Sequence, residues 1–130
     1  MVASNREMTR TEHGSGEEDR MRYLCLAYGA ERDWLALSEG EREELLANDE
    51  ILRERGDTVA VLGPTTTVRA WDRKPATTDE PFAKGNAPLV GFSIIDADDI
   101  DEVISLVAGT PCAVARGAIE IRPIESEIVD

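Results

Sequence analysis

Few side chains in this 130-residue sequence are suited to bond-making chemistry, and most of those are acids or arginines. The only histidine, His13, lies in a polar N-terminal segment. A serine–histidine or cysteine–histidine triad within one chain is therefore excluded, as is a zinc site built on several histidines. Cys25 and Cys112 lie far apart without C-x-x-C spacing, so we expect two reduced, half-buried thiols. Carboxylates, arginines and tyrosines remain as candidates, and we expect neither a metal nor a cofactor.

Two adjacent carboxylates, Asp79 and Glu80, begin a loop at 79–86 that is rich in turn-forming residues. Neighbouring carboxylates can raise the pKa of one of the pair, which can then act as a general acid or base. Adjacent side chains on a loop usually diverge, however, and Asp before a proline-containing turn is a common structural cap. The sequence leaves both interpretations open.

The segment 118–123 alternates between apolar and charged residues, with Ile119 and Ile121 on one side and Glu120 and Arg122 on the other. The isoleucines should pack against helices, so Arg122 should point to the opposite face of the sheet. The planar guanidinium of Arg122 suits a carboxylate ligand there. The alternative is a Glu–Arg pair across neighbouring strands or between two subunits.

Asp49 is an anomaly, because it falls between Leu45 and Leu52 on the apolar side of a predicted helix. It either reaches a pocket or bonds to nearby backbone. Tyr28 and Trp71 could line an aromatic pocket, although filling the core is the simpler role for each.

The acidic run at 96–102 superficially suggests calcium but fails the EF-hand pattern. Asp101 stands where glycine is required, and Val107 stands where the bidentate glutamate is required. Acids gathered at the start of a helix, where the macrodipole favours them, explain the run.

The hydrophobic pattern predicts the elements that must position these residues. A capping box at Ser38 and Glu41 should begin a helix that runs to about Arg55 and ends at Gly56, and a second helix should begin at Asp98 or Asp99 and end before Gly109. Strands are predicted at 22–28, 58–62, 65–71 with a returning hairpin segment through Thr78, 88–95 and 118–123.

This order predicts an α+β sandwich of ferredoxin-like type with an added hairpin. Two helices can cover only one face of the sheet, yet the runs at 22–28 and 88–95 are apolar on both faces. No other segment of the chain is long and apolar enough to cover the second face. A second copy of the chain is the economical cover, so we expect a homodimer.

Composition sets the boundaries and excludes several partners. Residues 1–20 are almost without apolar side chains and are expected to be a disordered extension. Met21 could therefore be an alternative translation start. The domain should span 21–124 and be followed by an acidic tail at 125–130. The net charge of −13 repels polyanions, so we expect no direct binding of nucleic acid or of an anionic membrane. Without an apolar leader or a membrane-spanning run, we expect a cytoplasmic protein.

Four segments in order resemble one known family. MRYLCLAYG at 21–29, TTTVRAWDRKPATTDEPF at 65–82, GFSIIDADDIDEVISLV at 91–107 and GAIEIRPI at 117–124 are together similar to the DGPF branch of the YCII-related proteins. The resemblance implies a ferredoxin-like dimeric α/β barrel. Most members of that branch are small cytoplasmic proteins of unknown activity. Some relatives are joined to sigma-factor-like regions, and at least one YCII-type relative is a dehydrochlorinase acting on a chlorinated aromatic ring.

The sequence departs from the family pattern at two places. The Asp-Gly-Pro-Phe motif is Asp79-Glu80-Pro81-Phe82 here, which replaces a conformationally free glycine by a charged residue. For the enzymatic members, the resemblance implies an Asp after the first strand and a His on the first helix. These positions correspond to Gly29 and to the vicinity of Leu46, so the dyad is absent.

Two function classes follow. The missing dyad favours a non-catalytic dimeric module that binds a small molecule or a regulatory protein partner. The alternative is a lyase or isomerase that uses carboxylate acid/base chemistry on a small anionic or aromatic substrate. In the ligand-binding case, we expect a carboxylate or enolate-like anion held by Arg122, with Asp79 closing the site from its loop. The further candidates for this site are Tyr28, Asp49, Phe82 and Glu120.

Overall fold

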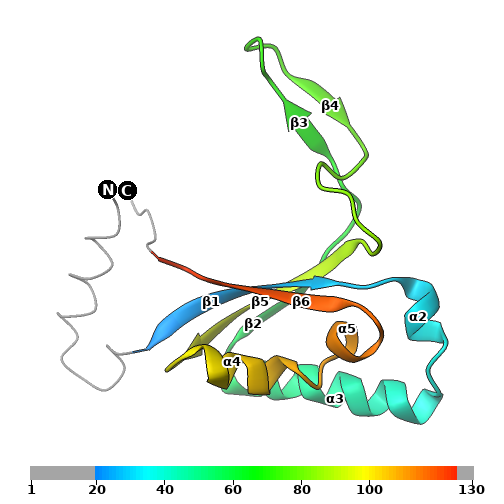
Figure 1. Cartoon of the computed structure of the whole chain (residues 1–130), viewed down its shortest axis with the longest axis vertical. Helices are drawn as coiled ribbons and strands as arrows, with labels where there is room; N and C mark the ends of the chain where they lie inside the picture. Colours follow the sequence, from blue (N-terminus) through cyan, green and yellow to red (C-terminus); the bar gives the residue numbers. More distant parts are fainter. Residues whose placement is uncertain (1–19, 126–130) are drawn as a thin grey trace.

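A four-stranded antiparallel sheet, in the order β2-β5-β1-β6, forms the centre of the protein in the computed structural model, which describes residues 20–125 (Figure 1). Its strands are β1 (Met21–Tyr28), β2 (Thr58–Val61), β5 (Leu89–Ala97) and β6 (Ala118–Pro123). The predicted α+β class is confirmed, and the strand order is compatible with a ferredoxin-like sandwich. Apart from Arg20 and Glu125, the expected N-terminal extension and C-terminal tail lie outside the described residues.

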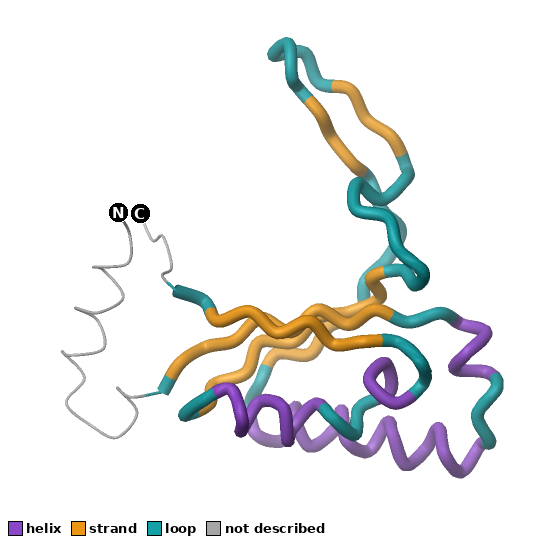
Figure 2. Tube along the Cα trace, in the orientation of Figure 1, coloured by secondary structure: helices purple, strands orange, loops and turns teal. Residues whose placement is uncertain are grey.

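All the helices of the described chain lie on one side of this sheet or at its end (Figure 2). The two long ones are α3 (Glu39–Arg55) and α4 (Ile100–Val107). Two short helices, α2 (Glu31–Leu35) and α5 (Pro111–Val114), occupy segments in which the sequence predicts no helix. Neither has a side-chain cap at its N-terminus, and their lengths of five and four residues are too short to show a hydrophobic period.

The predicted ends of the long helices are confirmed by their hydrogen bonds. Ser38 Oγ accepts from the Glu41 backbone N–H at 3.1 Å, and Glu41 Oε1 accepts from the Ser38 N–H at 2.8 Å. Gly56 ends α3 with a φ of 94°, in the left-handed region that glycine adopts without strain. Asp99, rather than Asp98, caps α4 by accepting from the Glu102 N–H at 2.9 Å.

The core lies between the helices and the sheet face that they cover, which we call the covered face. The sheet contributes Tyr23, Cys25, Ile95 and Ala97, and the helices contribute Leu52, Val103 and Val107; all of these are buried. Ile119 and Ile121 of β6 pack against the same cluster, as their alternation predicts. The opposite face of the sheet, which we call the open face, therefore carries the charged residues of β6.

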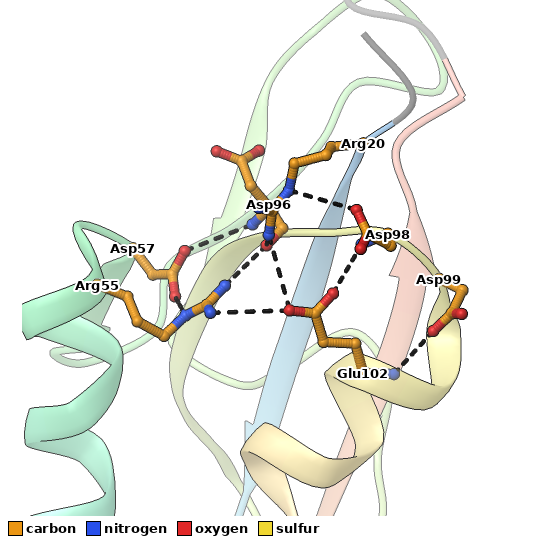
Figure 3. A network of polar contacts seen from close by, with 7 residues as sticks. All are labelled: Arg20, Arg55, Asp57, Asp96, Asp98, Asp99 and Glu102. Atoms are coloured by element: carbon orange, nitrogen blue, oxygen red, sulfur yellow. Dashed lines mark hydrogen bonds and ion pairs between the residues drawn. The ribbon is translucent and has the colours of Figure 1, made fainter. Parts of the chain in front are cut away.

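A polar network joins the end of β5 to the ends of both long helices (Figure 3). Arg55 donates from Nε to Asp57 Oδ2 and from Nη2 to the Asp96 carbonyl, each at 2.8 Å. The Asp57 carboxylate is only 5% exposed, so its pairing with Arg55 is needed to offset the loss of solvation. Arg20 Nη2 also donates to the Asp96 carbonyl at 2.8 Å, which ties this residue to the end of β5.

Between β2 and β5, residues 62–88 form an arm that leaves the sheet on the side away from the helices (Figure 1). The arm contains β3 (Thr67–Arg69) and β4 (Ala76–Thr78), which pair with each other in a separate two-stranded sheet. The predicted hairpin is confirmed, although β3 is shorter than the predicted strand at 65–71. Arg73, with a φ of 70°, lies in its turn.

Candidate ligand-binding face of the sheet

The centre of the open face is apolar. Leu24 and Leu26 of β1 lie directly opposite Ile94 and Phe92 of β5, so the four side chains form two adjacent cross-strand pairs. Each is partly buried within the chain, while α3 and α4 lie on the other side of the sheet. The prediction that both strands are apolar on both faces is therefore confirmed.

Two charged candidates lie beside this apolar centre on the edge strand β6. The register places Arg122 opposite Leu24 and Glu120 opposite Leu26, on the open face that the alternation predicts. Tyr28 joins them from the end of β1, where its hydroxyl donates to Glu120 Oε1 at 3.3 Å. Burial, followed by the adjacent Glu120 carboxylate, raises the pKa of the Tyr28 phenol above its ordinary value. Tyr28 therefore remains a hydrogen-bond donor at neutral pH.

Arg122 differs from Arg20, Arg22, Arg53 and Arg55, each of which pairs with a carboxylate. Among residues 20–125, no carboxylate forms an ion pair or hydrogen bond with its guanidinium, and its side chain is exposed. Glu120, the partner that the sequence offers as an alternative, is bonded to Tyr28 instead. Within one chain, the open face thus presents a free guanidinium next to an apolar surface and a tyrosine–carboxylate pair.

Asp79 and Phe82 lie on the arm rather than on the sheet. The Glu80 carbonyl accepts from Thr67 Oγ1 at 2.6 Å, and the Glu80 N–H donates to Thr78 Oγ1 at 3.3 Å. The Asp79–Phe82 motif therefore closes the foot of the β3–β4 hairpin.

Glu80 stands where the resemblance to the DGPF branch implies a glycine, and its backbone is not strained. Within the described chain, the non-glycine residues with positive φ are Arg73 and Arg116, and Glu80 is not among them. Its side chain makes an exposed ion pair with Lys84 at 3.2 Å.

Asp49 lies on α3 and is therefore separated from Arg122 by the sheet. It is half-buried, and burial raises the pKa of its carboxyl above the ordinary value, although the charge of Arg53 partly opposes the shift. Burial, and secondarily the charge of Asp49, also raises the pKa of the Cys112 thiol on α5. A thiol with a raised pKa is not an activated nucleophile at neutral pH.

The proximity of Cys112 to Gly29 was not predicted from the sequence. A Cβ added at Gly29 would lie 2.9 Å from Cys112 Sγ, so the thiol occupies the space that a side chain at this position would need. Gly29 is the position that the resemblance assigns to the dyad aspartate. The small residue at 29 was a signal of close packing, but its partner is 83 positions away and could not be identified from the sequence.

Residues 20–125 contain neither a metal-binding cluster nor a membrane-spanning helix. No group of three or more His, Cys, Asp or Glu side chains in this part of the chain is arranged to hold a metal ion. None of its helices combines the length and the apolar character required to cross a membrane.

Comparison with protein families gives a match that spans most of the chain. The model of the YCII-related domain matches residues 21–128. Among curated proteins, none matches the sequence. The matched residues include the whole sheet, both long helices and the arm, in a strand order compatible with a ferredoxin-like fold. The chain belongs to the YCII-related family.

Proposed function

We propose that this protein is a cytoplasmic homodimer of the DGPF branch that binds a small organic anion between its two sheets, without performing chemistry on it. The observation that carries the proposal is the exposed guanidinium of Arg122, which has no carboxylate partner among the described residues and borders an apolar sheet face. The two halves of the proposal, dimer and anion, rest on different features of this face.

The apolar centre of the open face supports the dimer. Leu24, Leu26, Phe92 and Ile94 present large side chains that the helices of their own chain do not cover. Two such faces packed about 10 Å apart would bury both sets and form the barrel that the family resemblance implies.

The position of Arg122 supports the anion. In a face-to-face dimer, the edge strand β6 places this guanidinium at the border of the space between the sheets. Removing an unpaired charge from water costs several kcal/mol, so a guanidinium that becomes buried there requires an anion. A carboxylate matches its two parallel N–H groups, and the neighbouring leucines would contact an apolar ligand body.

One observation favours the alternative, a lyase or isomerase. The hydrogen bond between Tyr28 and Glu120 brings a phenol and a carboxylate together on the face that carries Arg122. Such a pair could move a proton to or from a bound enolate-like substrate. The missing dyad favours binding without catalysis, which also suits a regulatory module that passes its ligand state to a protein partner.

The test compares Arg122→Met with a matched control, Arg32→Met, which removes an exposed guanidinium from α2 on the helical side. Thermal-shift measurements with a panel of aliphatic and aromatic carboxylates should find at least one acid that stabilises the parent and the control. Arg122→Met should remain dimeric in sedimentation equilibrium and lose that stabilisation.

A parent that is stabilised by no carboxylate, together with an Arg122→Met variant whose dimer weakens, would show that Arg122 pairs with a carboxylate between subunits instead. Consumption of the stabilising acid by the parent but not by Glu120→Gln would favour the enzymatic alternative.

A further inference from the structure

The arm, residues 62–88, exposes large apolar side chains to an unusual degree. Trp71 is 86% exposed, Phe82 70% and Val68 61%. A two-stranded hairpin has little stability of its own in water, and clustered exposed aromatic residues mark interaction surfaces. Some other surface is therefore needed to explain why the arm carries these residues.

The aromatic residues are held in place before any partner binds. The Arg69 guanidinium lies 5.2 Å from the centre of the Phe82 ring and 5.7 Å from that of the Trp71 ring, within the range of cation–π attraction. The hydrogen bond that Thr67 donates to Glu80 and the one that Glu80 donates to Thr78 close the foot of the hairpin. The arm thus presents a preformed platform, which lowers the entropic cost of binding.

The direction of the arm identifies the side on which its partner lies. Figure 1 shows the arm rising from the sheet on the side opposite α3, α4 and α5, which is the side of the open face. One limb of the arm, residues 64–71, can extend by roughly 25 Å, whereas packed sheets lie only about 10 Å apart. A second copy seated on the open face would therefore meet the arm, which would continue past its sheet toward its helices.

Charge also favours a second copy of this chain. The arm has four basic and three acidic side chains, hence a charge of +1, whereas the whole chain carries −13. Both lysines of the sequence, Lys74 and Lys84, are in the arm. Helix α3, by contrast, has seven acidic side chains against three arginines. The tip of one arm is thus electrostatically complementary to the helical side of another copy.

We propose that the arm of each chain clasps a second copy of the same chain, with Trp71 and Phe82 packed on its surface and Arg73 and Lys74 directed to its acidic helices. The inference rests on the homodimer proposed above. It adds a second contact area outside the sheets, one that accounts for the length, the aromatic platform and the charge of the arm.

Trp71 itself reports whether the arm is covered. In the full-length Trp34→Phe variant, Trp71 is the only tryptophan, and its fluorescence can be followed during dilution from a concentration at which sedimentation shows a dimer. We expect a blue-shifted emission in the dimer that moves to the red as the chains separate. A water-exposed emission throughout would overturn the clasp, leaving the arm for a different protein.

A substitution measures the strength of the contact. Trp71→Ala should raise the dissociation constant of the dimer at least about tenfold, as is typical of a tryptophan at the centre of an interface. Trp71→Phe is the matched control, since it keeps an aromatic ring at the same exposed position, and it should change the constant far less. Equal constants for the two variants would overturn the proposal.

A third variant separates failure of the clasp from failure of the sheet contact. Leu24→Glu places a charge at the apolar centre of the open face and should dissociate the dimer if the sheets pack together. The clasp alone would be disproved if Leu24→Glu abolishes the dimer while Trp71 in the Trp34→Phe dimer shows the emission of a fully exposed tryptophan. A dimer sensitive to Trp71→Ala but not to Leu24→Glu would disprove the sheet contact alone, and a monomeric parent would disprove both.

Discussion

The two faces of the central sheet are similar in sequence but differ in what covers them. On the covered face, Cys25 and Ile95 are 1% and 0% exposed beneath α3 and α4. On the open face, Leu24 and Ile94, which directly precede these two residues in the same strands, are only partly buried. The covered face is buried within one chain, because the helices that pack on it belong to the same chain. The open face carries large apolar side chains that no helix of the described chain covers.

Removing a side chain from the covered face should have the largest effect. Ile95 is fully buried, so Ile95→Ala loses its transfer free energy and leaves a cavity, at a cost of about 2–5 kcal/mol in the free energy of unfolding. Denaturant unfolding should show the same loss in the free energy of unfolding from this cavity at every protein concentration. A cost below about 1 kcal/mol would mean that the helices repack over the site.

The same substitution one residue earlier tests the open face. Ile94→Ala should cost less than Ile95→Ala in dilute solution, about 1 kcal/mol, because Ile94 is only partly buried within one chain. At high concentration the cost should increase, because a dimer that buries Ile94 is weakened as well. Urea unfolding across a wide range of protein concentrations makes this comparison. A cost that does not depend on concentration would contradict a dimer formed through this face.

Substitutions at two glycines test the packing on the helical side of the sheet. Gly29→Ala should destabilise the fold by about 1 kcal/mol, since its Cβ would lie 2.9 Å from Cys112 Sγ and the thiol must move. Gly40→Ala is the control on α3, where nothing lies within 4 Å of the added Cβ, and it should stabilise the helix by up to about 1 kcal/mol. Adding Cys112→Ala to Gly29→Ala should restore part of the loss, whereas additive effects would argue against the contact.

The smallest effect concerns Asp49. Because burial raises its pKa in the folded chain, the folded state binds this proton more tightly than the unfolded state, and stability falls as the pH rises through the interval between the two pKa values. Asp49→Asn removes this penalty and should be slightly more stable than the parent at neutral pH, by less than about 1 kcal/mol. The advantage should vanish in acid, below the ordinary carboxyl range.

Thermal unfolding of Asp49→Asn and the parent as a function of pH makes this measurement. Glu54→Gln, an exposed position on the same helix, is the control and should show no comparable gain at neutral pH. A destabilised Asp49→Asn variant at neutral pH would indicate that the charged form makes a favourable contact.

Features that involve residues close together in the sequence could be predicted, whereas contacts between distant residues could not. The capping box of α3 and the alternation of β6 involve residues within a few positions of one another, so the helix start and the face of Arg122 were predicted. The bond from Tyr28 to Glu120 spans 92 positions and required the strand order β1-β6, which no local pattern reveals.

The candidate site was therefore predicted only in part. Arg122 and Glu120 were predicted to share one face, and the register of β6 places them there. Asp79 was predicted to close the site from its loop; this loop lies at the foot of the arm, and its approach to Arg122 in a dimer stays a prediction. A loop's position depends on the direction in which the preceding hairpin leaves the sheet, and turn residues do not encode that direction. Asp49 was correctly identified as an anomaly on α3, whereas its neighbour Cys112 was not found.

The location of both lysines has a practical consequence for handling the protein. Amine-reactive reagents acylate lysine side chains and the terminal amine. Between the start of β1 and the end of β6, they can therefore modify only the arm. Biotin or a dye attached to the lysines therefore blocks or reports on one segment, next to Trp71 and Phe82. Surface immobilisation through lysine would disturb the proposed clasp, while coupling through the numerous carboxylates of α3 would tether the opposite side of the sheet.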